Sequence, residues 1–355
     1  MSDIEFYDGT KLLSMKDING NTPEIFICCT NRNAGKTTYF NRLVMNKYLK
    51  KGEKFCIINR FNYELDDVAD KFFKDIGSLF FFGLELRSKR KANGIYHELF
   101  LIRNHDEETA ESCGYAISLN SADQIKKYSH LFSDVSCMIF DEFQSETNHY
   151  CNDEVKKFIS IHTSIARGQG EQVRYVPVYM IGNHVSIINP YYVEMKISSR
   201  LNSKTKFLRG KGFVVEQGYN ESASQAQKTS GFNQAFSDNS YTKSASGDSV
   251  YLNDNYAFIE TPVGYMPRYL ATIKYEGKEY AIKEYRDLGI IYCDDHPDRT
   301  FRYKISVTTD DHNINYVMLK SNDMFISTLR YYFDRGCFRF KDLKCKEAIF
   351  KCLSY

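Results

Sequence analysis

Thr30-Asn31-Arg32-Asn33-Ala34-Gly35-Lys36-Thr37 is the stretch of the sequence that decides the fold. The apolar run Ile25 to Cys29 precedes it, and the run Thr37 to Lys50, with apolar residues at helical spacing, follows it. A strand, a loop ending in Gly-Lys-Thr and a helix form the pattern of a phosphate-binding P-loop, although Thr30 stands where that pattern has its first glycine. Because Gly-Lys-Thr alone is a weak signal, the flanking strand and helix are what favour a nucleotide site over an ordinary turn.

The residue types in this loop suit a nucleoside triphosphate with Mg²⁺. Backbone amides at the amino end of a helix bind β-phosphate oxygens, Lys36 would reach the β- and γ-phosphates, and the Thr37 hydroxyl would be a Mg²⁺ ligand. We therefore predict ATP and Mg²⁺ as cofactors. The nucleotide-binding residues predicted in the loop and the first helical turn are Thr30, Asn31, Arg32, Asn33, Ala34, Gly35, Lys36, Thr37 and Thr38.

Two adjacent carboxylates, Asp141 and Glu142, follow a second apolar run, Val135 to Phe140. The carboxyl ends of parallel strands face the ligand crevice, so we predict a Walker B arrangement in which Asp141 holds the Mg²⁺ shell and Glu142 orients or deprotonates the attacking water. The alternative is that the two adjacent carboxylates cap the amino end of a helix. A glutamate directly after the Walker B aspartate favours hydrolysis over phosphate transfer to a small molecule, which predicts an ATP hydrolase.

Two arginines and an asparagine are further candidates for this site. Arg167 ends a predicted helix and is followed by Gly168-Gln169-Gly170, so it could act as an arginine finger in a neighbouring subunit or could be a solvated helix end. Arg174 enters a predicted strand and is expected to be structural. Asn183 ends that strand, where its amide could sense the γ-phosphate or simply form a turn.

Short β-branched runs alternate with helical patterns from Glu24 to about Asn183, which predicts an α/β domain around a mainly parallel sheet. The further elements expected in this half are a strand Lys54 to Asn59, a helix over 63–76, a hairpin from Leu84 to Arg103, a helix over 153–167 and a strand Val173 to Ile181. After a polar segment, a smaller α+β domain is expected. Its predicted strands are Tyr269 to Lys274, Tyr280 to Tyr285 and Gly289 to Cys293, and its predicted helices are Phe325 to Phe333 and Leu343 to Leu353.

The polar segment between Gly218 and Asp254 is rich in Ser, Gly, Asn and Gln and has few aliphatic residues. Such a composition offers little apolar burial to offset the entropy of ordering the chain, which predicts a linker or mobile loop. We therefore expect a P-loop ATPase domain over 1–200, a linker and mobile Ser-rich segment over 201–255, and a C-terminal domain over 256–355.

The composition excludes several classes of protein. With 43% hydrophobic and 26% charged residues, the 355-residue chain is neither disordered nor a small disulfide scaffold. Its 10 cysteines include no CxxC pair, and no pair of its 8 histidines has zinc-finger spacing, so a reducing, cytosolic setting is expected and a structural metal site is disfavoured. No apolar stretch approaches the ~18 residues that a membrane span needs.

Contact with nucleic acid would have to come from local basic clusters, because the formal net charge is only +2. Three clusters are candidates: Arg87 to Lys91, Met195 to Val215 and Arg330 to Lys351. The second has six basic residues and no acid, namely Lys196, Arg200, Lys204, Lys206, Arg209 and Lys211. Solvated surface charge is the alternative for each cluster.

The order of these motifs resembles the DNA-packaging ATPases of small tailed phages of the phi-twenty-nine group. The resemblance is carried by Gly35-Lys36-Thr37, by Ile139-Phe140-Asp141-Glu142-Phe143, by Val173-Arg174 and by the run from Gly182 to Tyr191. It is strongest from about Glu24 to Tyr192 and weaker from Tyr269 to Phe340. By position, Lys36 and Thr37 match the Walker A motif, Asp141 the Walker B acid, Glu142 the catalytic glutamate, Arg167 the finger and Asn183 the sensor.

The resemblance implies an ATPase of the additional-strand, catalytic-glutamate (ASCE) class with a three-layer fold, followed by a terminase-like, degenerate RNase H-like domain that binds nucleic acid and lacks nuclease activity. It implies a bacteriophage motor that translocates double-stranded DNA into a preformed capsid through the portal, working as a homo-oligomeric ring, with a pentamer as the implied size. Such a motor would act in the host cytoplasm, transiently at the portal vertex, without a membrane partner, and a scaffold RNA is a further partner that the family allows.

Two other functions stay open at this point. One is another P-loop helicase or remodelling ATPase, although the C-terminal half has no second set of motor motifs. The other is a DNA-binding assembly protein with a vestigial nucleotide site, which only Thr30 at the first glycine position favours.

Overall fold

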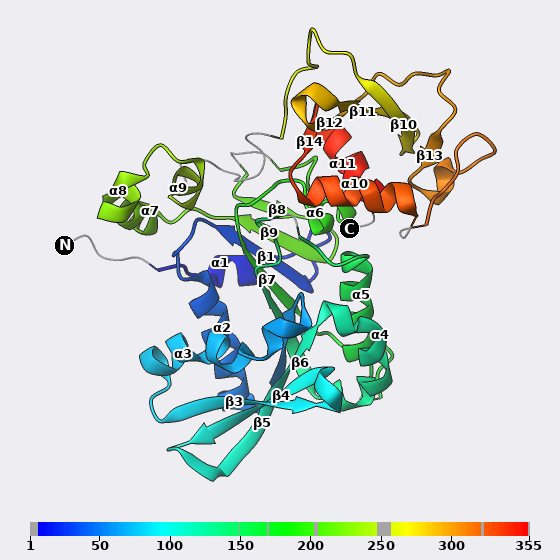
Figure 1. The fold of residues 1–355 in the computed structure, drawn as a ribbon. Coiled ribbons are helices and arrows are strands. Elements are labelled where there is room, and N and C mark those ends of the chain that lie inside the picture. The colour runs from blue at the N-terminus through cyan, green and yellow to red at the C-terminus, as the bar shows by residue number, and fades with distance from the viewer. Residues whose placement is uncertain are drawn as a thin grey trace. The chain divides into compact units, whose positions relative to one another are not determined.

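The computed structural model describes residues 6–147, 149–168, 170–201, 205–246, 257–320 and 323–353. The chain forms two compact units, each made of separate stretches of sequence (Figure 1). The first unit comprises Met1–Gln144, Lys156–His184 and Leu201–Val250, and the second comprises Ser145–Val155, Val185–Arg200 and Tyr251–Tyr355. Two short stretches inside the expected ATPase half therefore fold with the C-terminal unit.

The first unit is built on a nine-stranded sheet with the order β3-β4-β5-β2-β6-β7-β1-β9-β8. Its strands are β1 Ile25–Thr30, β2 Lys54–Asn59, β3 Leu84–Lys91, β4 Tyr96–Arg103, β5 Asp106–Ser118, β6 Val135–Asp141, β7 Val178–Asn183, β8 Phe207–Arg209 and β9 Phe213–Gln217. The six strands from β5 to β9 in this order are mutually parallel, and the outer strands pair antiparallel. The predicted α/β class with a mainly parallel sheet is confirmed, and β7 lies between β1 and β6.

Helices lie on both faces of this sheet, which explains why its central strands are almost wholly apolar. On one face, α2 Lys36–Lys51 and α3 Val68–Phe80 share a core with Cys137 and Ile139 of β6. On the other face, Phe140 stacks on Phe158 of α5 Glu154–Ile165, with 6.0 Å between ring centroids. Alternate residues of β6 thus serve opposite faces, as the pleat of a strand requires.

Small helices complete the first unit. They are α1 Thr10–Ser14, α4 Ala122–Ile125, α7 Glu221–Thr229, α8 Gly231–Ala235 and α9 Ser240–Ala245, with 3-10 turns η1 Asn62–Leu65, η2 Ala92–Gly94, η3 Leu119–Ser121 and η4 Lys126–Phe132. In the described part of the chain, no helix is both long and apolar enough to cross a membrane.

Two predicted elements differ in extent from the structure. The strand expected from Val173 begins only at Val178, because Pro177 has no amide hydrogen for a sheet ladder and the side chains of Val173 and Tyr175 are exposed. The helix expected over 63–76 is split into η1 and α3. The long strand β5 was not predicted, because its first half carries acidic, exposed residues that resemble a loop in sequence.

The linker expected over 201–255 is structured over much of its length. Residues 207–217 form β8 and β9, and β9 pairs in parallel with β1. Residues 221–245 form α7, α8 and α9 despite their polar composition. The Asn220 side chain caps α7 by accepting a hydrogen bond from the amide of Ala223 at 2.7 Å. Residues 202–204 and 247–255 of the predicted segment lie outside the described residues.

The second unit contains a five-stranded mixed sheet with the order β13-β10-β11-β12-β14. Its strands are β10 Arg268–Tyr275, β11 Lys278–Tyr285, β12 Ile290–Asp294, β13 Lys304–Ser306 and β14 Phe338–Phe340. Its other elements are α6 Pro190–Glu194, α10 Met324–Asp334, α11 Leu343–Cys352, η5 Arg286–Leu288 and η6 Thr309–Asp311. The predicted strands and helices of this α+β region are present.

Candidate nucleotide site

The loop between β1 and α2, which the sequence predicts to be a P-loop, turns through residues with positive φ angles. Gly35 is the N-cap of α2 with φ 90°, a conformation that glycine adopts without the penalty of a side chain. Asn33 has φ 60° and is exposed, whereas Ala34 is buried. The loop therefore turns sharply at the end of β1 and delivers Lys36 and Thr37 to the first turn of the helix.

Thr30, which departs from the P-loop pattern, fits its surroundings. Its side chain is 1% exposed and its hydroxyl donates to the carbonyl of Asn31 at 3.0 Å. Gly218, just after β9, lies beside it, so that a Cβ built on Gly218 would be 2.8 Å from Thr30 Cγ2. The absence of a side chain at Gly218 thus leaves the space that the Thr30 side chain occupies.

Lys36, at the start of α2, and Asn183, at the end of β7, are brought together because β1 and β7 are neighbouring parallel strands. The Lys36 side chain is buried, and its Nζ donates to Asn183 Oδ1 at 2.7 Å. Burial lowers the pKa of Lys36, because removal from water disfavours the charged amine. The predicted phosphate-binding lysine and the predicted sensor therefore already contact each other at the end of β7.

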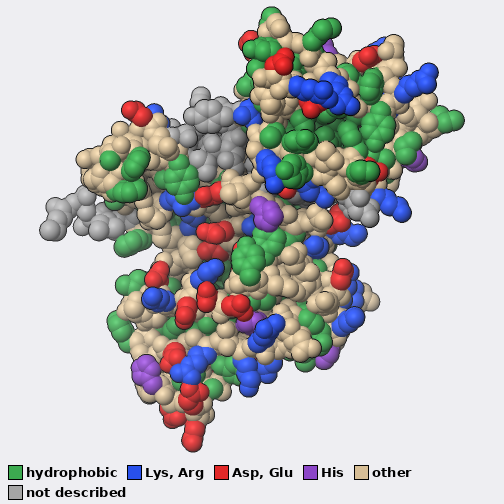
Figure 2. All heavy atoms as spheres, in the orientation of Figure 1, with side chains coloured by type: hydrophobic (Ala, Val, Ile, Leu, Met, Phe, Trp, Pro, Cys, Tyr) green, Lys and Arg blue, Asp and Glu red, His purple; other side chains and the backbone are tan. Residues whose placement is uncertain are grey.

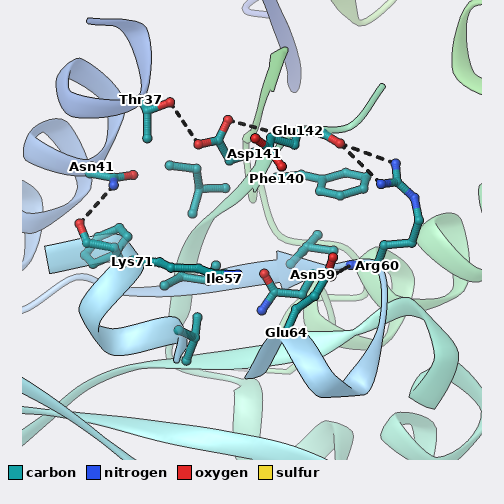
Figure 3. A pocket seen from close by; sticks show the side chains of 14 residues that line it. Thr37, Asn41, Ile57, Asn59, Arg60, Glu64, Lys71, Phe140, Asp141 and Glu142 are labelled. Carbon is teal, nitrogen blue, oxygen red and sulfur yellow. Dashed lines mark hydrogen bonds between the residues drawn. The ribbon is translucent and has the colours of Figure 1, made fainter. Parts of the chain in front are cut away.

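Thr37 and Asp141 form the second pair. The Thr37 hydroxyl donates to Asp141 Oδ2 at 2.9 Å, and the amide of Glu142 donates to Asp141 Oδ1 at 2.9 Å (Figure 3). Burial raises the pKa of Asp141. A hydroxyl and a carboxylate are hard oxygen ligands of the type Mg²⁺ takes from proteins when phosphates supply the remainder, so these residues fit the predicted ion.

Glu142 has an unusual backbone, and a residue that sequence reasoning missed supports it. Glu142 is exposed and has φ 53°, in the left-handed region. The buried guanidinium of Arg60 donates to the carbonyl of Glu142 at 3.3 and 3.4 Å (Figure 3). It also donates to the carbonyl of Phe143 at 2.7 Å. The Glu64 carboxylate accepts hydrogen bonds from the backbone amides of Arg60 at 2.7 Å and Phe61 at 2.9 Å, which fixes the backbone at Arg60.

Arg60 could have been found from its place in the sequence. It directly follows β2, which lies beside β6 with Ile58 opposite Phe140. That register places Arg60 level with Glu142 at the carboxyl edge of the sheet. Polar residues that directly follow neighbouring parallel strands meet at the carboxyl edge of the sheet. This rule would have added Arg60 to the candidate site residues.

A cavity of about 510 Å³ lies beside these residues, between β2, β6, α2 and α3 (Figure 3). Its wall includes Thr37, Asp141 and Glu142. The remaining lining residues are Asn41, Ile57, Ile58, Asn59, Arg60, Glu64, Val68, Lys71, Phe72, Ile139 and Phe140. The predicted metal and catalytic residues thus face a space that holds several polar groups.

Arg167 is not brought to this group of residues. It is exposed just after α5, and the next residue, Gly168, lies beside Ser133, before the start of β6. Asp141 lies at the other end of β6, about 20 Å away at ~3.3 Å per residue. Arg174 is structural as expected, because it donates to the carbonyls of Val135 at 3.0 Å and Ile165 at 2.7 Å.

The predicted basic clusters are partly paired with acids. In the first, Arg87 pairs with Glu85 and Glu107, and Lys91 with Glu98. In the third, several lysines are engaged: Lys341 with Asp295, Lys344 with Glu347, Lys351 with Glu194, and the buried Lys346 with Ser186. On the face in Figure 2, basic side chains are interspersed with acidic ones.

The middle cluster, Met195 to Val215, is divided between the two units. Lys196 lies 3.8 Å from Glu276, and Lys206, Arg209 and Lys211 follow in the first unit. Lys204 lies outside the described residues.

Comparison with known proteins identifies the family of the chain. The model of the podovirus DNA encapsidation protein (Gp16) family matches residues 1–354. The chain belongs to this family. Two Gp16-family relatives are the DNA packaging proteins of Bacillus phages PZA and phi29, each 24% identical over 339 residues that cover 94% of this chain and 93% of the relative. The predicted resemblance is confirmed, and DNA packaging is the function of the family.

Two solved structures share the fold over nearly the whole Gp16-family chain. The Phi-28 gp11 DNA packaging motor is 15% identical, with a TM-score of 0.58 and 99% of both chains covered. The bacteriophage Phi-29 viral genome packaging motor assembly is 21% identical, with a TM-score of 0.52 and 95% of both chains covered. At these identities the likeness concerns the fold alone.

Proposed function

We propose that this Gp16-family chain hydrolyses ATP to drive double-stranded DNA through the portal into a preformed capsid. The observation that carries the proposal is the convergence of Lys36, Asn183, Thr37 and Asp141, with Glu142, at the carboxyl edge of one parallel sheet. The position of β7 between β1 and β6 supports the additional-strand, catalytic-glutamate class within this three-layer fold.

Each site residue has a separate proposed role in ATP hydrolysis. Lys36 would exchange its bond to Asn183 for the β- and γ-phosphates, and Thr37 and Asp141 would hold Mg²⁺. The ion, when bound, neutralises charge that develops on the phosphate oxygens. Glu142 would orient the attacking water and accept its proton, with its backbone held by Arg60. Asn183, released from Lys36 by the nucleotide, would sense whether the γ-phosphate is present.

Arg167 is proposed to complete the site of a neighbouring subunit. Its place at the amino end of β6 is far from the Lys36 and Asp141 of its own chain, so a role in the same subunit would need a large movement of the sheet. An exposed arginine followed by Gly168 and Gly170, both with positive φ, suits contact with another copy of the chain. This supports a homo-oligomeric ring, proposed as a pentamer, at the portal vertex.

The second unit is proposed to be a vestigial RNase H-like, nucleic-acid-binding domain without nuclease activity. Two-metal nucleases need several carboxylates that converge on two metal ions about 4 Å apart. Here Asp294 is buried and accepts from Lys283 at 2.6 Å, and Asp295 is paired with Lys341. No cutting of DNA is expected with Mg²⁺ or Mn²⁺, and metal-dependent cutting abolished by Asp294→Ala would contradict this.

The deciding experiment measures ATP turnover with and without double-stranded DNA and purified portal-bearing capsids, the proposed partners in the host cytoplasm. A packaging motor is expected to turn over faster with DNA and to protect added DNA from nuclease only when capsids and ATP are both present. In a separate arm of the experiment, ATP turnover is measured after a scaffold RNA of the kind that the family allows is added to the capsids. ATPase activity indifferent to DNA and capsids would favour another remodelling ATPase instead.

A further inference from the structure

The polar segment after β9 is joined to the P-loop by several contacts. Asn31 and Asn220 form a reciprocal pair, in which the Asn31 side chain donates to the Asn220 carbonyl at 3.0 Å and accepts from the Asn220 amide at 2.8 Å. The guanidinium of Arg32 lies 5.0 Å from the ring centroid of Tyr241 in α9. The helices that follow β9 are therefore attached to the loop by side-chain contacts and form one of its walls.

A second cavity, of about 490 Å³, lies where this segment meets the loop, within the size range of small-molecule sites. It is lined by P-loop residue Asn33, by Phe6 near the start of the chain, and by Ser222, Ala223, Ala226, Gln227, Ser230 and Asn233 of α7, α8 and the residue between them. Phe6 is held against the loop, with its Cδ1 3.2 Å from the position of a Cβ on Gly35, yet 69% of it is exposed.

The position of this cavity matches the base end of a bound nucleotide. Lys36, which would hold the γ-phosphate, forms a hydrogen bond with Asn183 at the end of β7. Thr37, which would hold Mg²⁺, forms one with Asp141 at the end of β6. In a nucleoside triphosphate the base is at the end opposite the γ-phosphate. Since β1 lies between β7 and β9, the base is expected on the β9 side of the loop, which is where Phe6, α7 and α8 lie.

The cavity also offers the chemistry that an adenine needs. Phe6 provides an exposed aromatic face for stacking. Asn233 Nδ2 donates to the Oε1 of Gln227 and, at 2.9 Å, to its carbonyl. In the described part of the chain, this leaves Gln227 Nε2 as a donor and Asn233 Oδ1 as an acceptor. Adenine presents a ring-nitrogen acceptor beside its amino donor, whereas guanine presents O6 in place of that donor.

We propose that this second cavity binds the adenine base, with Phe6 stacking on the ring and Gln227 and Asn233 selecting adenine over guanine. The inference rests on the proposed ATPase function, since it names the subsite that reads the base of the same nucleotide. It also assigns a role to the Ser-rich segment, which shapes one wall of the nucleotide site.

The test compares ligands with and without a base. Full-length protein carrying Glu142→Gln, which is expected to bind ATP without hydrolysing it, is titrated calorimetrically with ATP, GTP and inorganic tripolyphosphate, each with Mg²⁺. Phe6→Ala is expected to weaken ATP about 10-fold and to leave tripolyphosphate unchanged, because only stacking is lost. Phe6→Tyr, which keeps the ring, should bind ATP as the parent does. Gln227→Ala should reduce the preference for ATP over GTP.

Gln225→Ala is the matched control, because Gln225 is exposed on α7 and does not line the cavity. Unchanged ATP affinity and selectivity in Phe6→Ala and Gln227→Ala, or equal weakening of ATP and tripolyphosphate, would overturn the base site. If Asn59→Ala instead weakens ATP but not tripolyphosphate, the base lies in the cavity beside Glu142. If the unaltered protein binds no ATP at all, the proposed function itself fails.

Discussion

The two sides of the loop between β1 and α2 differ in how the chain builds them. On the β7 side, Asn183, Asp141 and Glu142 end their strands or directly follow them, and their positions follow from the parallel sheet. On the β9 side, the wall is made by helices of low apolar content that Asn220 ties to Asn31. The β7 side therefore depends on strand order, whereas the β9 side depends on hydrogen bonds between segments distant in sequence.

The largest effect is expected for Arg167, which lies on neither side of the loop in its own chain. Arg167→Ala should bind ATP nearly normally but lose hydrolysis by roughly 10³-fold or more, as other arginine fingers do. Mixed with Glu142→Gln, it should regain partial ATPase activity, because some interfaces then combine an intact Glu142 with an intact Arg167. The measurement is steady-state turnover across mixing ratios with DNA present.

Tethered dimers that keep one intact interface are the control for this experiment, because one inactive subunit can stall a ring that fires sequentially. An absence of ATPase activity in such dimers would contradict the proposal that Arg167 acts on the site of a neighbouring subunit.

Two substitutions on the β7 side should separate binding from chemistry. Lys36→Ala should weaken ATP binding, because its buried amine is the proposed phosphate contact. Glu142→Gln should bind ATP but lose turnover by roughly 10²–10⁴-fold, in the range of a lost general base. Equilibrium binding of a fluorescent ATP and single-turnover kinetics measure the two effects. An equal loss of nucleotide binding in both variants would show that Glu142 is structural.

Arg60 tests whether the backbone of Glu142 must be held in place. Arg60→Ala removes the donors to the carbonyls of Glu142 and Phe143 and should lower kcat by roughly 10- to 100-fold with little change in KM, as expected for a misplaced catalytic group. Arg42→Ala, which removes an exposed arginine on α2, should leave both parameters unchanged. A rise in KM at constant kcat would assign Arg60 to substrate binding instead.

The smallest effect concerns the fit between Thr30 and Gly218. Gly218→Ala adds a methyl group 2.8 Å from Thr30 Cγ2 and should destabilise the first unit by about 1–3 kcal/mol, the usual range for overpacking. Thr30→Ser removes that methyl and should recover much of the loss in the double variant. Urea denaturation of the four proteins measures the coupling. Additive effects would show that the two residues do not constrain each other.

The elements that could be predicted are those whose side chains follow a simple period. β1, β2 and β6 are short apolar runs because both sheet faces are covered, and α2 shows helical spacing of its buried residues. Lys36, Thr37 and Asp141 could be predicted for the same reason, since each stands at a strand end or helix start. By contrast, α7 has a polar composition, and nothing in that composition indicates that Asn220 caps it.

The sequence by itself determined the residue types of the phosphate and acid motifs, the parallel sheet that presents them and, through the order of those motifs, the family. Only the tertiary structure decided that Arg60 supports Glu142, that Gly218 makes room for Thr30, and that Arg167 lies away from its own site. The physical reason is the range of the interactions. Periodicity and strand-end position are local properties of the chain, whereas these three outcomes depend on strand order and on contacts between residues that the fold alone brings together.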